Sequence, residues 1–189
     1  ANLHVIIDFV PNHVAREYHS TCKPKGVEDL GANDNPAWAF SPLNNFYYIH
    51  EAFAPQFDAK GYSENPTRAT GNDCFTARPA KDDWYETIKL NYGVFYQNGG
   101  EQQFDPIPNT WYKMRDILLF WASKGIDGFR CDMAEMVPQA FWAWAIAQVK
   151  EQYPTILFIA EVYNPDLYRS YIAAGFDYLY DKVGMYDYL

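Results

Sequence analysis

The feature that most constrains this 189-residue sequence is a set of three short acidic motifs, each of which follows an apolar run typical of a β-strand. The motifs are DFVPNH at residues 8–13, GFRCD at residues 128–132 and FIAEVY at residues 158–163. Strands that end at a carboxylate are typical of the carboxyl-end rim of a parallel α/β barrel, where such folds keep their chemistry. We therefore expect the motifs to meet at one rim.

Strands and helices alternate around these motifs. A first strand is predicted from Leu3 to Phe9, and further strands are predicted near residues 126–132, 155–161 and 176–180. Alternation of this kind implies a parallel sheet with right-handed crossovers.

Helix signals lie between the predicted strands. One helix begins near Asn109 and ends at Gly125, and the next has Pro138 in its first turn. The last follows an Asn164-Pro165 cap pair and runs to about Ala174. The fold class is therefore predicted to be α/β.

A long segment with little helical periodicity interrupts the alternation. It is rich in Asn, Asp, Gly, Pro and Tyr, and apolar runs at residues 46–49 and 87–90 predict short strands. So long an excursion inside a compact fold is typical of a functional insertion. We expect three parts: residues 1–13 with the first strand and motif, residues 14–108 as a small irregular or β subdomain, and residues 109–189 as βα units.

The second and third motifs support acid–base and nucleophilic chemistry. Side chains alternate along a strand, so Arg130 and Asp132 point the same way, and the guanidinium would keep Asp132 ionised as a nucleophile. Glu161 ends the next strand, which allows the two carboxylates to lie about 5–5.5 Å apart, the separation of retaining glycoside hydrolysis. A raised pKa would let Glu161 protonate the leaving oxygen and later activate water. The structural alternative is an Arg130–Asp132 ion pair and a solvated Glu161.

The order and spacing of the three motifs resemble the α-amylase family of glycoside hydrolases, and residues 88–91 (IKLN) resemble a short motif near the end of that family's inserted domain. The resemblance covers nearly the whole chain. It implies a partial TIM (β/α)8 barrel, from the third to the sixth strand, with an inserted domain. It assigns Asp132 to the nucleophile, Glu161 to the general acid/base and Arg130 to their partner in substrate binding.

The resemblance also implies contacts to substrate and metal. Asp8 matches a rim aspartate that supports the site, and His13 matches a donor to the sugar in the cleaved subsite. Asn12 matches a residue that helps to hold the insertion, often with calcium. Tyr163, beside Glu161, is predicted to line the cleft.

Three departures from the family pattern limit these assignments. Glu135 and Met136 stand where the family has a Lys-His pair, so contacts to acceptor-side sugars must differ. Lys89 stands where calcium-dependent members carry an aspartate, and an ammonium competes with Ca²⁺ for the same negative neighbours. The sequence leaves Ca²⁺ and Lys89 as alternatives. The family's third acidic residue, in a His-Asp motif after the seventh strand, has no match in this chain.

Composition indicates which classes of binding partner the protein favours. A net charge of −9 argues against a nucleic-acid partner, and 19% aromatic residues suit the apolar faces of sugars. No apolar run reaches the ~18 residues of a membrane span, and an extracellular or periplasmic location is favoured over the cytoplasm. Cys22 and Cys74 fall in the irregular region, where they either pair or remain ordinary thiols, and Cys131 is expected to be a core residue.

The leading prediction is a retaining hydrolase of α-1,4-linked glucans or maltooligosaccharides that forms a covalent glucosyl intermediate on Asp132. A transglycosylase of the same family, such as a glucanotransferase or a trehalose-forming enzyme, shares the same core residues. A non-catalytic carbohydrate-binding homologue is a rival that the three residues Arg130, Asp132 and Glu161 argue against. A metal-dependent barrel hydrolase would need several His ligands, and only His13 lies in a motif.

The length predicts an internal piece of a longer enzyme, because a complete eightfold barrel takes ~250 residues. Four strands of a closed barrel leave two unpaired edges and an open apolar face. We therefore expect the chain, without the remainder of its barrel, to be poorly folded, self-associated or inactive.

Overall fold

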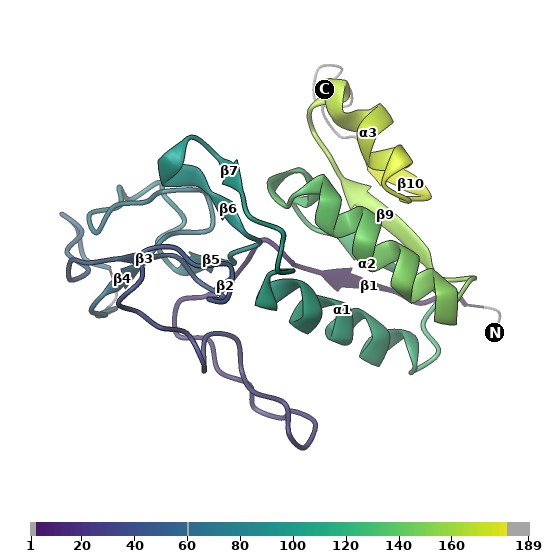
Figure 1. Ribbon diagram of the computed structural model, residues 1–189, viewed down its shortest axis with the longest axis horizontal. Coiled ribbons are helices and arrows are strands. Elements are labelled where there is room, and N and C mark those ends of the chain that lie inside the picture. The colour runs from purple at the N-terminus through teal and green to yellow at the C-terminus, as the bar shows by residue number, and fades with distance from the viewer. Residues whose placement is uncertain (1–2, 60, 181–189) are drawn as a thin grey trace. The chain divides into compact units, whose positions relative to one another are not determined.

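The computed structural model describes residues 3–59 and 61–180, and the chain divides into two compact units (Figure 1). The sheet unit comprises the residues up to Asn12 together with those from Trp111 onward. The inserted unit comprises His13–Thr110. Each unit is described by itself.

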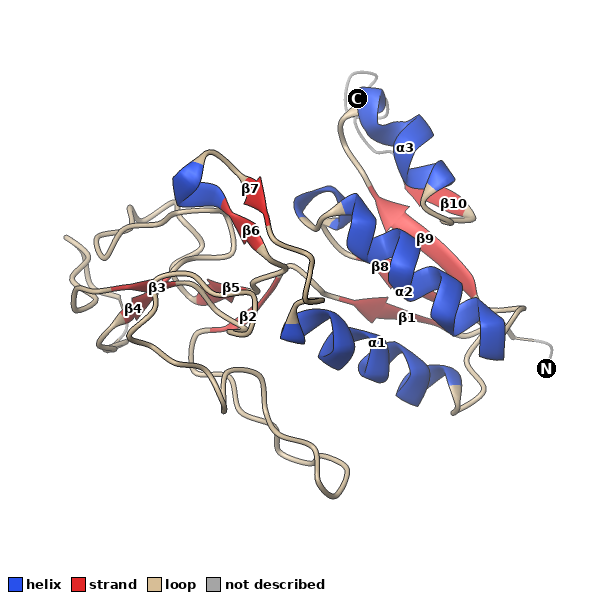
Figure 2. Ribbon diagram, viewed as in Figure 1, coloured by secondary structure: helices blue, strands red, loops and turns tan. Residues whose placement is uncertain are grey.

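The sheet unit is built on four parallel strands in the order β1-β8-β9-β10. The strands are β1 (Ile6–Phe9), β8 (Gly128–Cys131), β9 (Leu157–Glu161) and β10 (Tyr178–Tyr180). Helices connect the last three strands, as Figure 2 shows. The α/β class and the parallel sheet are therefore confirmed.

Helices of this unit form where apolar residues recur at helical spacing. The helices are α1 (Asn109–Ala122), α2 (Gln139–Gln152) and α3 (Tyr168–Ala173), with short 3₁₀ turns η2 (Ala134–Met136) and η3 (Pro165–Leu167). The first helix buries a stripe made of Trp111, Met114, Leu118 and Ala122. Gly125, with a φ of 79°, follows it in the left-handed conformation that commonly ends a helix.

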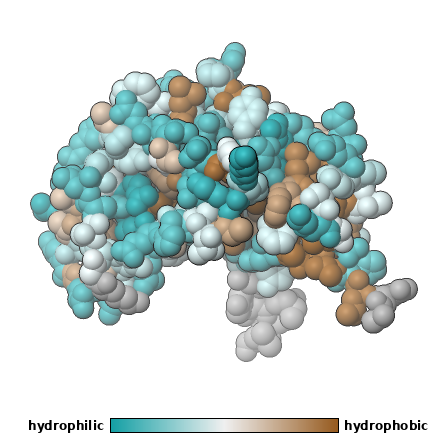
Figure 3. Space-filling model, turned by 90° about the horizontal axis from the view of Figure 1, so that it is seen from below, coloured by the Kyte–Doolittle hydropathy of each residue, from teal (hydrophilic) through white to brown (hydrophobic). Residues whose placement is uncertain are grey.

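Alternation along the strands separates a core face from a polar face. Phe129 and Cys131 are fully buried, and Phe129 packs on Phe158 with ring centroids 5.4 Å apart. Cys131 is thus the core residue that the sequence predicts. The opposite face carries Arg130, together with apolar side chains that remain exposed: Ile6, Val10, Tyr178 and Tyr180. Figure 3 shows apolar surface, in brown, on this unit.

All four strands start later than their sequences predict: β1 at residue 6 and not at 3, β8 at 128 and not at 126, β9 at 157 and not at 155, and β10 at 178 and not at 176. An aspartate lies directly before two of these starts, and its side chain hydrogen-bonds to the neighbouring strand. The carboxylate of Asp127 accepts the N–H of Val5 at 2.7 Å, and that of Asp177 accepts the N–H of Phe158 at 2.8 Å.

Gly128 lies where β8 passes closest to its neighbours. A Cβ built there would be 2.6 Å from the carbonyl oxygen of Leu157 and 2.9 Å from Cδ1 of Ile6. Because the first of these atoms is backbone, Gly128→Ala should force the strands apart and destabilise the protein by about 1–3 kcal/mol. The check is the midpoint of thermal unfolding. An unchanged midpoint would show that the sheet adjusts without cost.

The inserted unit contains three two-stranded antiparallel sheets joined by loops. They pair β2 (His13–Ala15) with β5 (Thr87–Lys89), β3 (Tyr48–Ile49) with β4 (Thr67–Arg68), and β6 (Val94–Phe95) with β7 (Glu101–Gln102), and the 3₁₀ turn η1 (Tyr96–Asn98) follows β6. Its apolar core includes Phe46, Tyr47, Ile88 and Leu90, which lie in the runs predicted to be strands.

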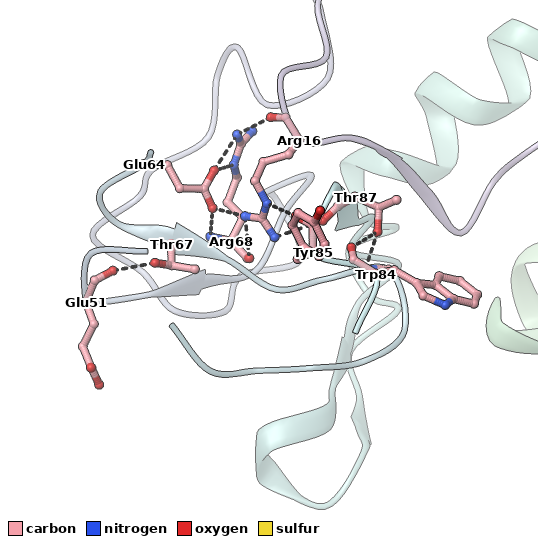
Figure 4. Close-up of polar contacts among 9 residues, drawn as sticks. Arg16, Glu51, Glu64, Thr67, Arg68, Trp84, Tyr85 and Thr87 are labelled. Carbon is pink, nitrogen blue, oxygen red and sulfur yellow. Dashed lines mark hydrogen bonds and ion pairs between the residues drawn. The ribbon is translucent and has the colours of Figure 1, made fainter. Parts of the chain in front are cut away.

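A buried ionic network organises the loops of the inserted unit (Figure 4). Arg16 is 2% exposed and its guanidinium contacts the Glu64 carboxylate. Arg16 also donates to the carbonyl oxygens of Tyr85 at 2.6 Å and Thr87 at 3.0 Å. Arg68 donates to Glu64 at 2.8 Å and to the carbonyl of Arg16 at 2.8 Å. These side chains satisfy backbone groups that short strands leave unpaired.

The cysteines are free thiols, with Cys22 exposed and Cys74 partly exposed, so the pairing left open by the sequence does not occur in this structure. Within the part of the chain that the structure describes, no helix has the length and apolar character needed to cross a membrane.

Candidate active site

The three acidic motifs meet at the carboxyl ends of β1, β8 and β9. Asp8 lies opposite Arg130 in the register of β1 and β8, and Cys131 lies opposite Ala160 in that of β8 and β9. Asp132 follows directly, with its N–H donating to the carbonyl of Phe9 at 2.8 Å. The register therefore brings together side chains more than 100 residues apart in the sequence.

Arg130 contacts all three carboxylates. Its Nη1 lies 2.8 Å from Oδ1 of Asp8 and 2.7 Å from Oδ1 of Asp132, and its Nη2 lies 2.7 Å from Oε2 of Glu161. Partial burial disfavours the charged guanidinium, but hydrogen bonds to Asp8 and Asp132 outweigh it and raise the pKa of Arg130. One permanent cation thus holds the ends of three strands together.

Asp132 and Glu161 respond differently to this shared cation. Burial is the main influence on Asp132 and, with the neighbouring Glu161 carboxylate, it raises the pKa of Asp132 despite the opposing effect of Arg130. Two acidic side chains so close together favour a single negative charge between them at low pH.

Glu161 is almost fully buried and is surrounded by donors. Its Oε2 accepts the N–H of Met133 at 3.1 Å in addition to the Arg130 contact, and its Oε1 accepts the Tyr163 hydroxyl. Burial alone would raise the pKa of Glu161, but Tyr163, Met133 and Arg130 together lower it to about 2. The expectation of a raised pKa for Glu161 is therefore wrong in this structure, because donors gather around the carboxylate.

Met133, directly after Asp132, has a left-handed backbone with φ 45° and ψ 42°. Residues other than glycine rarely adopt this conformation, and such outliers gather at functional sites. Met133 directly precedes the turn η2. This turn is anchored by the indole N–H of Trp142, which donates to the carbonyl of Ala134 at 3.0 Å. The chain thus turns sharply at the residue that donates to Glu161.

Tyr163 was expected to line a cleft, and the structure gives its hydroxyl a contact with Glu161. Its backbone is held by a residue that sequence reasoning left without a role. The Glu135 carboxylate accepts the N–H of Tyr163 at 3.1 Å and that of Asn164 at 3.0 Å. The one available signal was an acidic residue at a position where the resembling family has a Lys-His pair.

The remaining two predicted site residues are His13 and Asn12. His13 begins β2 of the inserted unit, where its ring lies edge-on to Trp84 with centroids 5.4 Å apart. Asn12 is buried at the end of the first segment of the sheet unit. The sugar contact of His13 and the metal contact of Asn12 stay predictions.

Comparison with known proteins agrees with this geometry, although no protein-family model matches the sequence. The chain is 36% identical over 164 residues to the α-1,4-glucan:maltose-1-phosphate maltosyltransferase of Chlorobaculum tepidum, which covers 80% of this chain and 24% of that protein. The enzyme of the same name from Cereibacter sphaeroides is 35% identical over 97 residues, covering 51% of this chain and 14% of that one. The crystal structure of an α-amylase from Lactobacillus plantarum matches with a TM-score of 0.52 and 25% identity, covering 99% of this chain and 34% of that one.

The chain belongs to the α-amylase family. It spans about a quarter or less of the length of the two maltosyltransferases. Membership in the α-amylase family makes the junction of Asp132, Glu161 and Arg130 the candidate active site.

The residues around Lys89 are where the resemblance to calcium-dependent members of the α-amylase family would place their ion. The Nζ of Lys89 is buried and lies 2.6 Å from Oδ1 of Asp73 and 5.1 Å from the ring centroid of Tyr96. Residues 3–59 and 61–180 contain no group of three or more His, Cys, Asp or Glu side chains placed to hold a metal ion. A buried ammonium repels a divalent cation, so the surroundings of Lys89 do not fit calcium.

Proposed function

We propose that this chain carries catalytic residues of a transglycosylase that moves a maltosyl group between maltose 1-phosphate and an α-1,4-glucan. The observation that carries the proposal is the clamp of Arg130 on Asp132 and Glu161 at adjacent strand ends. The substrates come from the names of the maltosyltransferase relatives. The names of these relatives favour the transglycosylase alternative over the leading prediction of a hydrolase.

The proposal includes the setting of the site. The four parallel strands would be the third to sixth of an eight-stranded barrel, since eight strands close such a sheet. The remaining strands would come from the rest of the protein, together with the third acidic residue of the family. Asp8, in β1, would support the site beside Arg130.

Transfer would proceed in two steps with retention. Asp132 attacks the anomeric carbon of the donor, the bond from that carbon to the phosphate oxygen breaks, and phosphate leaves with the electron pair. In the second step Glu161 accepts the proton of an acceptor hydroxyl. The oxygen of that hydroxyl attacks the anomeric carbon, and the bond from this carbon to Asp132 breaks. Arg130 stabilises the carboxylates in both steps.

The donors around Glu161 support a phosphate leaving group. A sugar that leaves from a glucan departs as an alkoxide unless an acid protonates it, whereas phosphate leaves as a stable anion. Glu161, with its pKa lowered to about 2, is a carboxylate at neutral pH, which is the form that accepts a proton in the second step. A glucan hydrolase would need Glu161 protonated in its first step.

The test is to incubate the complete protein, with the remainder of its barrel, with maltose 1-phosphate and a maltooligosaccharide, and to follow phosphate release and product length. We expect phosphate release that depends on the acceptor, and products longer by two glucose units. A parallel incubation without maltose 1-phosphate measures hydrolysis of the maltooligosaccharide. Cleavage there, with no extension in the first incubation, would favour the hydrolase.

We also propose that the Lys89 ammonium supplies the positive charge that calcium provides in other members of the family. Lys89→Met, of similar length, should destabilise the protein by ~1–3 kcal/mol because Asp73 loses a charged hydrogen-bond partner. Lys81→Met, at an exposed position of the same unit, is the control. Added calcium or a chelator should leave the thermal midpoint of the unmodified protein unchanged, and a midpoint lowered by the chelator would contradict the proposal.

A further inference from the structure

The loop after β9 is tied to the turn after β8 by one side chain. The Glu135 carboxylate, in η2, accepts two consecutive backbone N–H groups, those of Tyr163 and Asn164. The Tyr163 hydroxyl in turn donates to Glu161. We infer that Glu135 is a positioning residue that holds the backbone of Tyr163 so that its hydroxyl orients the Glu161 carboxylate.

Both ends of this relay are themselves held in place. Glu135 lies in a turn of three residues that begins at the left-handed Met133, so its direction is set by the backbone that follows Asp132. Glu161 is the last residue of β9 and is paired with Tyr180 of β10. Tyr163 lies in the short loop that follows Glu161, and the Glu135 carboxylate holds the backbone of this loop.

Helix capping does not account for the Glu135 contact. The turn η3 has its own cap, because the side chain of Asn164 accepts the N–H of Asp166 at 3.0 Å. Glu135 binds the residues before that turn, at the level of Tyr163. Its two hydrogen bonds therefore fix the position of a functional side chain and are not needed to start the helix.

The tyrosine has one consequence for chemistry. A hydroxyl that donates to a carboxylate stabilises its ionised form and so lowers its pKa. Without that donor, Glu161 keeps the N–H of Met133, the guanidinium of Arg130 and the side chain of Asp132, but it loses the largest of the influences that lower its pKa. If the proposed function holds, the relay keeps Glu161 ready as the base that activates the acceptor hydroxyl.

The test measures Glu161 directly and requires no turnover. Protein labelled with ¹³C in the glutamate carboxyl carbons is titrated by NMR, with Glu161→Gln used to assign the signal. In the unmodified protein the Glu161 signal should stay that of a carboxylate at pH 4, where an ordinary glutamate with a pKa of about 4.3 is more than half protonated. Tyr163→Phe should move the titration midpoint up by at least about one pH unit.

Glu135 is tested by variants that separate positioning from bulk. Glu135→Ala should give a shift similar to that of Tyr163→Phe, and the double variant should add nothing, because both act through the same hydrogen bond. Glu135→Gln keeps an acceptor oxygen and should restore most of the original titration. Tyr153→Phe, outside the relay, should change nothing.

Two results would overturn the inference. If Glu135→Ala leaves the Glu161 titration midpoint at the value of the unmodified protein while Tyr163→Phe shifts it, the tyrosine needs no positioning. No shift in either variant would show that the hydroxyl does not hold Glu161. Near-ultraviolet circular dichroism confirms that each variant is folded, and transfer assays then report separately on the proposed function.

Discussion

We expect the Asp132→Asn variant to lose about 10⁴-fold or more in the rate of maltosyl transfer, the scale of loss on removing a catalytic nucleophile. The amide has nearly the same shape and can still accept a hydrogen bond from Arg130, but it cannot attack the anomeric carbon. The measurement is single-turnover release of phosphate from maltose 1-phosphate.

The matched control for this loss is Asp166→Asn, at an exposed position outside the three-carboxylate junction. It should retain the rate of the unmodified protein within about twofold, as expected of a surface change. Transfer by Asp132→Asn at a comparable rate would remove Asp132 from the role of nucleophile. Circular dichroism before the assay would separate this result from a loss of folding.

The second large effect is expected on stability, from Arg16→Met in the inserted unit. Arg16 and Glu64 are 2% and 11% exposed, so loss of the arginine leaves a buried carboxylate with one fewer cation. It also removes a donor from the backbone carbonyls of Tyr85 and Thr87. Breaking a buried pair costs about 3–5 kcal/mol. The thermal midpoint should fall by about 6–20 °C.

Hydrogen exchange locates this effect. Amides of β2, β5 and the loops joined by the network should exchange faster in Arg16→Met, because their hydrogen bonds depend on the arginine. Arg78→Met, at an exposed arginine of the same unit, is the control and should shift stability by less than about 0.5 kcal/mol. Equal behaviour of the two variants would show that the buried network is dispensable.

Much of the sheet unit was readable from the sequence. Apolar runs ending at Asp8, Asp132 and Glu161 predict parallel strands, because period-two alternation and strand-ending carboxylates are local properties. Asn164 marks the start of a turn because its side chain accepts a backbone N–H, and Gly125 follows a helix in a left-handed conformation that few other residues favour. The family resemblance rests on the same residues.

The proton affinity of Glu161 could not be read in this way. The direction of its pKa shift depends on whether burial or hydrogen-bond donors dominate. The donors are Arg130 in β8, Met133 shortly after β8, and Tyr163 after β9, and only the pairing of β8 with β9 brings them to one carboxylate. The hydrogen bonds of Asp127 and Asp177 to neighbouring strands depend on strand pairing in the same way.

Local periodicity and backbone preference set the alternation of strands and helices and the residue types that end the strands, so these features are predictable from the sequence. Folding decides which side chains share a partner: Arg130 among three carboxylates, Glu135 on the Tyr163 loop, and Arg16 on Glu64. Such contacts join residues distant in the chain, and their energies depend on burial and distance, which exist only once the chain has folded.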